Sequence, residues 1–376
     1  MLIVGGGPAG LAAAIAAREK GFRVLVADCS HPPIEKPCGE GLMPDSLAVL
    51  RRLGVSVGPS ESFPFRGIRF LQAGSSVEAP FPSRHGLGVR RAVLHRLLVG
   101  RARESGAHLV WDARVTHLGM NSVTLDDQTV RCRWIVAADG QNSLIRRWAG
   151  LDRRRHWKCR FAFRRHYRIA PWTDYMEIHW GNGCQIYITP VSPEEVCVVL
   201  MSHDRCLRLD HALPMFPELH IPLRGVPASA ESGALSVSAG YESVTDGRVV
   251  LMGDASGSVD AITGQGLHLS FQQALALAAA IESGDLTAYQ SAHRSLMQRP
   301  MLMSRLLLTL DRFPAVRGRA LQALAAKPEI FSHLLAAHLG TETLASVVAG
   351  QALPLLCRLL PVPGMRSKGE RCCGVQ

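Results

Sequence analysis

The sequence lacks the features that mark several classes of protein. No apolar run reaches the roughly 18 to 20 residues that span a bilayer. The first residues, MLIVGGGPAG, show neither a basic leader nor a cleavage site of small residues. The 10 cysteines form no C-x-x-C pair and no H-E-x-x-H motif occurs, so we expect no metal site. These absences predict a cytoplasmic protein whose thiols are kept reduced.

Acidic residues are fewer than basic ones, and charge as a whole is modest. The 376 residues include 42 Lys and Arg against 31 Asp and Glu, a net charge of +11, within a composition that is 47% hydrophobic. That balance excludes a disordered chain and favours anionic partners such as dinucleotide phosphates or a lipid surface. No zinc-finger spacing or RNP-like aromatic motif is present, so we expect no nucleic-acid partner, and no obligate protein partner is evident.

The chain opens with a pattern typical of dinucleotide binding. Apolar residues 2–4 predict a buried strand, an Ala-rich stretch ending before Gly21 predicts a helix, and residues 22–27 predict a second strand. Asp28 ends that strand, where a carboxylate can accept hydrogen bonds from a ribose. The turn between the first strand and the helix fits G-x-G-x-x-G and contains Gly5, Gly7, Pro8, Ala9 and Gly10. Its glycines allow a tight turn, a close approach to a pyrophosphate and close helix packing.

Two later motifs follow predicted buried strands. Residues 134–138 lead into Asp139 and Gly140, and residues 249–252 lead into Gly253 and Asp254. Parallel α/β sheets bind ligands at the carboxyl ends of their strands, which is where both acids are expected. A third stretch, Thr263-Gly264-Gln265-Gly266, precedes a long predicted helix whose N-terminus could face a polar ring edge.

These three signatures, in this order and spacing, resemble the FAD-dependent oxidoreductases that include para-hydroxybenzoate hydroxylase-like monooxygenases and geranylgeranyl reductases. The resemblance covers roughly residues 1–285 in architecture. It implies that the first motif holds the FAD pyrophosphate and that Asp28 binds the adenosine ribose. It also implies that Asp139 and Gly140 lie near FAD and are involved in the use of a nicotinamide cofactor. Gly253 and Asp254 would contact the ribityl-phosphate side.

Two further segments fit that family. Residues 91–107 resemble the family helix whose arginine lies against FAD, which is Arg91 here, with Arg90 as the alternative register. Residues 36–41, KPCGEG, resemble the K-P-C-G-x-G segment of the reductase branch, which places Cys38 and Gly39 beside the flavin. Cys38 would line the site; a small buried residue in a turn is the simpler interpretation, since no adjacent base favours a thiolate.

The reductase branch is not matched throughout. Its P-x-x-Y-x-W-x-F-P motif corresponds to residues 182–190, NGCQIYITP, which keep one aromatic residue and the final proline. The same segment lacks the W-x-W-x-I-P of flavin-dependent halogenases, which makes a halogenase a poor candidate.

The stretch from Trp157 to Ile169 alternates, as antiparallel strands do. One face is apolar and aromatic except for Arg165; the other is almost wholly basic, and we interpret it as a solvated outer surface. Because a guanidinium among core residues must be paired or must point into a cavity, Arg165 is a candidate for the substrate pocket. Neighbouring strands add polar candidates, each more often structural than catalytic: Glu177, His179, Gln185 and Tyr187.

The sequence thus predicts an α/β fold in which a Rossmann-like FAD-binding domain receives a β-rich antiparallel substrate domain and ends in a helical region. The FAD-binding domain would comprise residues 1–65, 84–152 and 240–285, the substrate domain residues 66–83 and 153–239, and the helical region residues 286–376. Prolines at 300, 314, 328 and 354 are expected to break the helical region. It would form a cap, with a lid over the substrate or a peripheral membrane contact as the alternative, suggested by residues 301–308 and 355–360.

The resemblance implies an enzyme with bound FAD and NAD(P)H as co-substrate. No second glycine-rich β-α-β unit follows the first, so the nicotinamide would bind transiently. A monooxygenase acting on a hydrophobic, aromatic or polyketide-like small molecule is favoured slightly; a reductase of C=C bonds in a prenyl-lipid-like substrate is the alternative. Catalytic candidates are Cys38, Arg165 and Tyr187.

Overall fold

The N-terminal strand lies inside a mainly parallel sheet whose central strands, Leu2–Val4, Ile135–Ala137 and Val249–Leu251, are short and fully buried. The computed structural model describes residues 1–82, 84–220, 223, 227–343 and 345. In the first sheet Leu2 pairs with Leu25 on one side and with Ile135 on the other. The six strands, in spatial order, are β18 (Thr245–Asp246), β19 (Val249–Leu251), β12 (Ile135–Ala137), β1 (Leu2–Val4), β2 (Leu25–Ala27) and β8 (His108–Val110). Such uninterrupted apolar strands are typical of parallel sheets covered on both faces.

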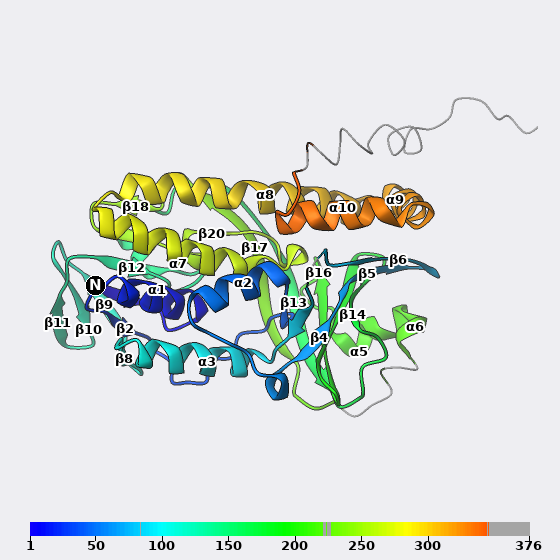
Figure 1. Ribbon diagram of the computed structural model, residues 1–376, viewed down its shortest axis with the longest axis horizontal. Coiled ribbons are helices and arrows are strands. Elements are labelled where there is room, and N and C mark those ends of the chain that lie inside the picture. Colours follow the sequence, from blue (N-terminus) through cyan, green and yellow to red (C-terminus); the bar gives the residue numbers. More distant parts are fainter. Residues whose placement is uncertain (83, 221–222, 224–226, 344, 346–376) are drawn as a thin grey trace, which may run out of the picture.

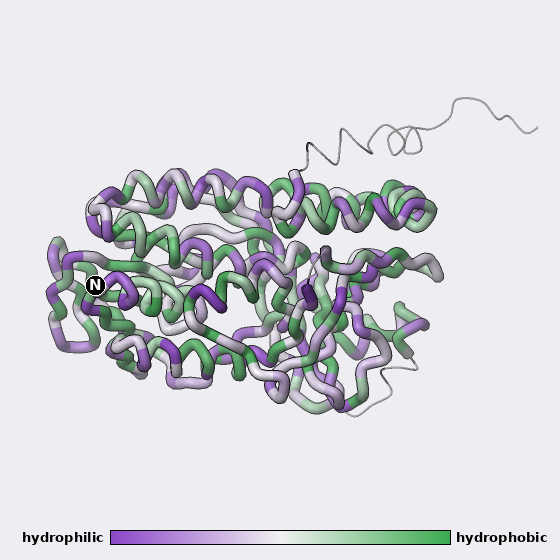
Figure 2. Tube along the Cα trace, viewed as in Figure 1, coloured by the Kyte–Doolittle hydropathy of each residue, from purple (hydrophilic) through white to green (hydrophobic). Residues whose placement is uncertain are grey.

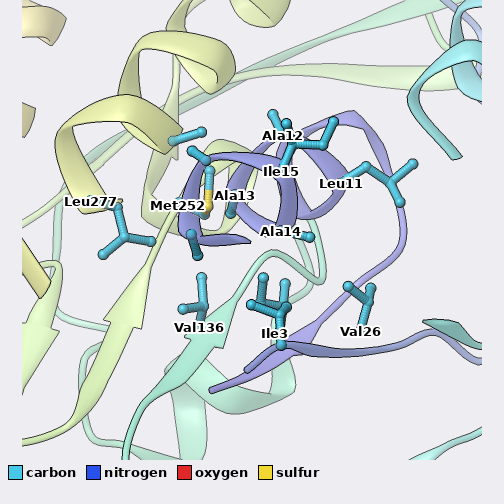
Figure 3. Close-up of a cluster of buried hydrophobic side chains, with 14 of the residues drawn as sticks. Ile3, Leu11, Ala12, Ala13, Ala14, Ile15, Val26, Val136, Met252 and Leu277 are labelled. Atoms are coloured by element: carbon cyan, nitrogen blue, oxygen red, sulfur yellow. The ribbon is translucent and has the colours of Figure 1, made fainter. Parts of the chain in front are cut away.

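Helices cover this sheet and bury its apolar residues. Figure 3 shows Ile15 of α1 (Pro8–Glu19), Leu277 of α7 (Gly266–Ser283) and Val136 of β12 converging in one cluster. The other helices here are α2 (Pro44–Arg52), α3 (Arg91–Glu104) and the short α4 (Leu144–Trp148). The apolar α1, rich in alanine, packs against α7.

The second large sheet has eight strands and lies beside the first (Figure 1). Its longest strand, β13 (Arg154–Tyr167), pairs antiparallel with β17 and with β16. Its spatial order is β20 (Gly257–Ser258), β17 (Ser232–Tyr241), β13, β16 (Glu195–Ser202), β15 (Cys184–Ser192), β14 (Tyr175–Trp180), β5 (Gly67–Gln72) and β6 (Ser75–Pro80). One face packs on α5 (Leu209–Ala212) and the segment after it, which includes η2 (Leu213–Met215) and α6 (Pro217–His220).

Two small sheets complete the strand inventory of the described residues. One contains β11 (Gln128–Arg131), β10 (Ser122–Leu125) and β9 (Val115–Leu118), and the other contains β3 (Gly41–Leu42), β7 (Gly86–Gly88) and β4 (Phe63–Phe65). Short 3₁₀ turns lie at η1 (Pro59–Glu61), η3 (Gly253–Ser256) and η4 (Ala261–Thr263).

Three helices follow α7: α8 (Leu286–Arg312), α9 (Pro314–Ala326) and α10 (Pro328–Leu339). Pro314 and Pro328 begin helices as expected, but the predicted break at Pro300 is wrong, because Pro300 lies inside α8. The packing of α8 on α7 and η4 outweighs the one hydrogen bond that a proline removes. Figure 2 shows hydrophobic and hydrophilic residues alternating along α8, as expected for a helix with one buried face. Pro354 and residues 355–360 lie outside the described residues.

The fold is therefore α/β, with a Rossmann-like parallel sheet, an antiparallel sheet and C-terminal helices. The strands at 67–80 and 154–241 belong to one sheet although the segment between them supplies strands to others. Among the described residues, no helix is both long and apolar enough to cross a membrane.

Candidate active site

A cavity of about 620 Å³ lies between the two large sheets. Its walls come from the carboxyl ends of β1, β2 and β12, from η3 and the N-terminus of α7, and from the inner face of the eight-stranded sheet. Segments from residue 4 to residue 270, far apart in the sequence, thus meet in one place. The arrangement is that of parallel α/β sheets, in which ligands bind beyond the carboxyl ends of the strands.

The glycine-rich turn forms one end of the cavity. Gly5 has a φ of +111°, and a Cβ there would lie 2.3 Å from the carbonyl oxygen of Ala138, so only glycine fits. At Gly10 a Cβ would lie 1.8 Å from the carbonyl oxygen of Gly5, which holds α1 close to β1. Gly7 differs from both: a Cβ there would meet nothing within 4 Å, and its backbone borders the cavity.

Three carboxylates from separate strands face this end of the cavity. Asp28 accepts hydrogen bonds from the backbone N–H of Gly6 at 2.6 Å and from that of Ser30 at 2.8 Å. Asp254 accepts from the ammonium of Lys36 at 2.7 Å. Asp139 accepts from the N–H of Leu144 with one oxygen, while its Oδ1 is buried without a hydrogen-bond partner. Burial raises the pKa of Asp139, against the opposing hydrogen bond of Ser143.

The structure separates the two arginine registers. Arg91 lines the cavity, and its buried Nε has no hydrogen-bond partner. Arg90 instead pairs with Glu195 and does not line the cavity. Of the two registers, it is therefore Arg91 that lines the cavity.

Within the KPCGEG segment, the buried carboxylate of Glu40 links the segment to α3 and to β13. Glu40 accepts hydrogen bonds from the backbone N–H of Arg91 at 3.0 Å, from the guanidinium of Arg164 at 3.1 Å and from His166 Nε2 at 2.7 Å. Burial would raise the pKa of Glu40, but the hydrogen bond and charge of His166 lower it below its ordinary value. Glu40 has a φ of +58°, a backbone conformation that these three contacts maintain.

Glu40, His166 and Cys197 bring a carboxylate, an imidazole and a thiol within 4.8 Å of one another. Both Glu40 oxygens already accept hydrogen bonds inside the protein. Burial raises the pKa of the Cys197 thiol well above its ordinary value, and the thiol donates to the carbonyl oxygen of Cys38. We therefore interpret the cluster as a set of hydrogen bonds that holds the KPCGEG segment in place.

The other end of the cavity is apolar and carries one phenol. Tyr187 lines the cavity, and its hydroxyl donates to Gln185 Oε1 at 2.6 Å. The same oxygen accepts from Arg160 at 3.1 Å, and Arg160 also pairs with Asp260. Burial raises the pKa of Tyr187 far above its ordinary value, against the charge of Arg160.

Comparison with known proteins identifies the family. A family model described as an FAD binding domain matches residues 1–164. The menaquinone reductase of Mycolicibacterium smegmatis is 30% identical over 353 residues, which cover 85% of this chain and 86% of the relative. The chain is an FAD-dependent oxidoreductase.

Other relatives of the oxidoreductase differ in their reactions. The digeranylgeranylglycerophospholipid reductase of Thermoplasma volcanium is 29% identical, with 71% of this chain and 74% of the relative covered. The 12-dehydrotetracycline 5-monooxygenase/anhydrotetracycline 6-monooxygenase of Streptomyces rimosus is 29% identical, with 74% and 61% covered. A solved flavin-dependent brominase shares the fold, with a TM-score of 0.80 at 19% identity over 95% of this chain and 98% of that chain.

The cavity of the oxidoreductase fits FAD. The open approach at Gly7 and the free N–H groups of the first turn of α1 suit a pyrophosphate. Asp28 is placed for a ribose, and the unpartnered Oδ1 of Asp139 and Nε of Arg91 offer one acceptor and one donor to a bound molecule. Most FAD-contact residues expected from the sequence line the cavity, namely Gly5, Gly7, Pro8, Ala9, Asp28, Cys38, Gly39, Arg91, Asp139, Gly140, Asp254, Gly264 and Gly266.

Two of the glycines expected at the FAD site lie behind the cavity wall. Gly10 and Gly253 do not line the cavity. A Cβ on Gly253 would lie 2.7 Å from the Cβ of Ala9, and its φ is +57°. Both glycines therefore let the turns at the cavity pack together.

The predicted pocket role of Arg165 is wrong. Arg165 does not line the cavity; its guanidinium pairs with Asp210, and its Nη2 lies 3.4 Å from Glu231. The part of this β13 face around Arg165 packs under α5 and outside the cavity, because Tyr167 and Phe163 belong to that outer cluster. The guanidinium is paired, which was the other possibility for a charge among core residues.

The opposite face of β13, interpreted as solvated, is the inner one. Arg160, Arg164 and His166 are buried, and only its ends, such as Lys158 and Arg168, are exposed. Their partners Asp260 and Glu40 lie far away in the chain, so no local pattern could reveal the pairing. Glu177 and His179 are buried and hydrogen-bonded to each other, outside the cavity wall.

Proposed function

We propose that this FAD-dependent oxidoreductase uses NAD(P)H to reduce a C=C bond in the isoprenoid chain of a prenyl lipid. The observation that carries the proposal is the character of the cavity beyond the flavin-binding end. Its wall is apolar, and the two acids expected to titrate near neutrality or above, Cys38 and Tyr187, are kept protonated.

The apolar wall suits a hydrocarbon chain. Strands of the eight-stranded sheet and η4 supply branched and thioether side chains, which adapt to a flexible ligand. These residues are Ile68, Met176, Ile178, Val199, Met201 and Ile262. Glu40 reaches this region, but its oxygens are engaged by Arg164 and His166. A hydroxylase acting on a phenol would gain from a free base here, and the described residues of this end of the wall offer none.

Reduction of a C=C bond needs a hydride on one carbon and a proton on the other. Bound FAD, once reduced, supplies the hydride. The protein must supply the proton, so an acid that stays protonated at neutral pH is required. Burial raises the pKa of the Cys38 thiol, against the charge of Arg91, and it raises that of the Tyr187 phenol. We assign the proton to Tyr187, because Arg160 nearby would stabilise the phenolate that remains.

The relatives support this choice. Similarity to a menaquinone reductase extends over 85% of the chain, and a digeranylgeranylglycerophospholipid reductase is similar over 71%. The KPCGEG segment, which resembles the reductase branch, lies at the cavity wall through Cys38 and Glu40. NAD(P)H would bind transiently near Asp139 and Gly140, as the family resemblance implies.

The sequence slightly favours a monooxygenase, and two observations keep that reaction as the second candidate. The tetracycline monooxygenase of Streptomyces rimosus is similar over 74% of the chain. Residues 182–190 also depart from the reductase motif. On β15, Gln185 and Tyr187 stand where that motif has Tyr and Trp.

Anaerobic turnover separates the two reactions. The holoenzyme would be mixed with NADPH and a short-chain menaquinone in detergent, without oxygen, and the product analysed by mass spectrometry. We expect a product heavier by one H₂ that keeps this gain after the quinone ring is re-oxidised in air. A gain that disappears on re-oxidation would mean ring reduction only. Turnover that requires O₂, with ¹⁸O entering the product, would overturn the proposal in favour of the monooxygenase.

A further inference from the structure

We propose that the rim of the cavity docks on an anionic lipid bilayer. The docking rim consists of four exposed apolar side chains: Leu144 and Trp148 of α4, Trp157 of β13 and Leu235 of β17. The proposal extends the proposed function, since a prenyl lipid would have to enter from a membrane, but its test does not depend on turnover.

The four side chains belong to one surface. Trp157 pairs with Ala239, and Phe161 pairs with Leu235, so Trp157 and Leu235 project from the same face of the β13–β17 ribbon. The helix α4 packs on this face, because the guanidinium of Arg146 lies 4.3 Å from the centre of the Tyr241 ring. Leu144 and Trp148 are four residues apart and share one side of α4.

Their exposure is unusual for side chains of this size. Leu144 is 40% exposed, Trp148 and Leu235 are 43% exposed and Trp157 is 46% exposed. Two of the three exposed tryptophans in the described part of the chain lie on this rim. Tryptophan is the side chain most typical of the membrane interface, where its ring is buried among headgroups and its N–H stays hydrated.

The rim also joins the cavity. Leu144 and Leu235 both line it, and the side-chain amide of Gln141 lies 3.5 Å from the carbonyl oxygen of Leu235. Exposed side chains that line a cavity mark its opening. A lipid leaving the bilayer at this rim would therefore enter the same cavity whose other end carries the apolar wall and Tyr187.

Positive charge surrounds the rim. Between residues 147 and 155, four exposed basic side chains stand against one carboxylate, that of Asp152; they are Arg147, Arg153, Arg154 and Arg155. The two that reach a carboxylate do so at long range, Arg153 to Glu242 at 3.8 Å and Arg154 to Asp152 at 3.7 Å. Basic side chains beside interfacial apolar ones are the combination that binds anionic leaflets.

A second exposed apolar group lies on α8 and α9, with Leu302, Leu306, Phe313 and Val316. None of these lines the cavity. They contain no tryptophan, so the interfacial chemistry favours the rim around α4. The two surfaces can be tested side by side.

Vesicle sedimentation with the full-length holoenzyme tests the proposal. Vesicles would contain either phosphatidylcholine alone or phosphatidylcholine with phosphatidylglycerol. We expect binding only to the anionic vesicles, weakened by salt, and reduced at least tenfold in Arg147→Glu with Arg155→Glu and in Trp148→Ser with Trp157→Ser. The matched controls are Arg51→Glu with Arg52→Glu, which make the same charge change on exposed positions of α2, and Leu302→Ser with Leu306→Ser. Both should bind as wild type does.

Several results would overturn the docking rim. They are absence of binding to anionic vesicles, equal loss in the α2 control, and loss in the α8 variant with no loss in the rim variants. If Arg147→Glu with Arg155→Glu raises the KM for NADPH and leaves vesicle binding intact, the charges serve the nicotinamide cofactor instead. Thermal unfolding and FAD absorbance of each variant confirm that it is folded.

Failure of the proposed function would look different. A holoenzyme that binds anionic vesicles through the rim but reduces no prenyl lipid keeps the docking surface and rejects the reaction. Conversely, rim variants should reduce a detergent-dispersed short-chain substrate at the wild-type rate and lose activity only on substrate in anionic vesicles.

Discussion

At the scale of single residues, Glu40 decides how the two halves of the site are joined. Its carboxylate is completely buried and bonds to Arg164 and His166 of the long strand β13 and to the backbone of Arg91 at the start of α3. A buried carboxylate is stable only when its charge is compensated, and two basic side chains compensate it here. The KPCGEG segment is thereby fixed against the substrate sheet, with Cys38 at the cavity.

Replacing Glu40 by Gln should destabilise the fold by about 3 to 5 kcal/mol, because Arg164 would lose its buried partner. The pKa of Glu40 is lowered from its ordinary value of 4.5, so the carboxylate contributes stability above that pH and loses it as the pH falls through the native pKa. Chemical unfolding of wild type and Glu40→Gln at several pH values measures this. The difference should be constant above pH 4.5 and shrink below it. A difference that grows on acidification would contradict the assignment.

Replacing Tyr187 by Phe tests the proton donor. Gln185 keeps its hydrogen bond from Arg160, so the fold should lose only about 1 kcal/mol. Reduction of the substrate C=C bond should slow about 100-fold, whereas reduction of the flavin by NADPH should not change. Because the pKa of Tyr187 is raised, the phenol is protonated throughout, and the wild-type rate of this step should be flat between about pH 6 and pH 9.

Stopped-flow measurement of the two half-reactions separates these effects. The matched control is Cys38→Ala, which removes the other protonated acid of the wall. If Tyr187→Phe reduces the C=C bond at the wild-type rate and Cys38→Ala does not, the proton donor is the Cys38 thiol and not Tyr187.

At the scale of elements, different glycines of the glycine-rich turn serve ligand binding and helix packing. Gly7 borders open space in the cavity, whereas Gly10 brings α1 against the backbone of Gly5. The sequence motif treats these positions alike, but their surroundings predict opposite consequences of the same substitution.

Replacing Gly7 by Ala should leave the fold intact and remove FAD, since the new methyl group would occupy the space that a pyrophosphate needs. Replacing Gly10 by Ala should destabilise the protein itself, because the methyl group would collide with a backbone carbonyl. Absorbance of the purified proteins reports the flavin, and thermal unfolding after FAD is stripped reports the fold. Equal loss of apoprotein stability in both variants would refute this division.

The sequence predicted those elements whose signal is local. Three strand–turn motifs identified the carboxyl edge of the parallel sheet, and with it Asp28, Asp139 and Asp254 in one cavity. The strand β13 shows the limit. Its alternation was recognised, but which face turns inward depends on Asp260 and Glu40, which are distant in sequence. A run of basic residues is usually solvated, so composition alone predicts exposure for Arg160, Arg164 and His166, which are in fact buried.

At the scale of the whole molecule, the cavity is built from chain segments that lie far apart in the sequence. Residues from Val4 to Ser270 line it, and both large sheets contribute. Arg160 adds a link of its own, since it connects β13 to Asp260 before η4 and to Asp311 on α8. The relative placement of the two sheets depends on these links and also on the ligand that fills the cavity between them.

Removing FAD should consequently weaken the whole fold rather than one loop. A ligand that binds only the folded state and is present at about 100 times its Kd stabilises it by about 2.7 kcal/mol, which corresponds to a Tm change of several degrees in a protein of this size. Thermal unfolding of apoprotein with rising FAD should therefore show a Tm that climbs steadily with concentration. Gly7→Ala provides the control, because its fold is expected to be sound while its FAD site is blocked, and its Tm should not respond. If the wild-type Tm ignored FAD as well, the cavity between the two sheets would not be where the cofactor binds.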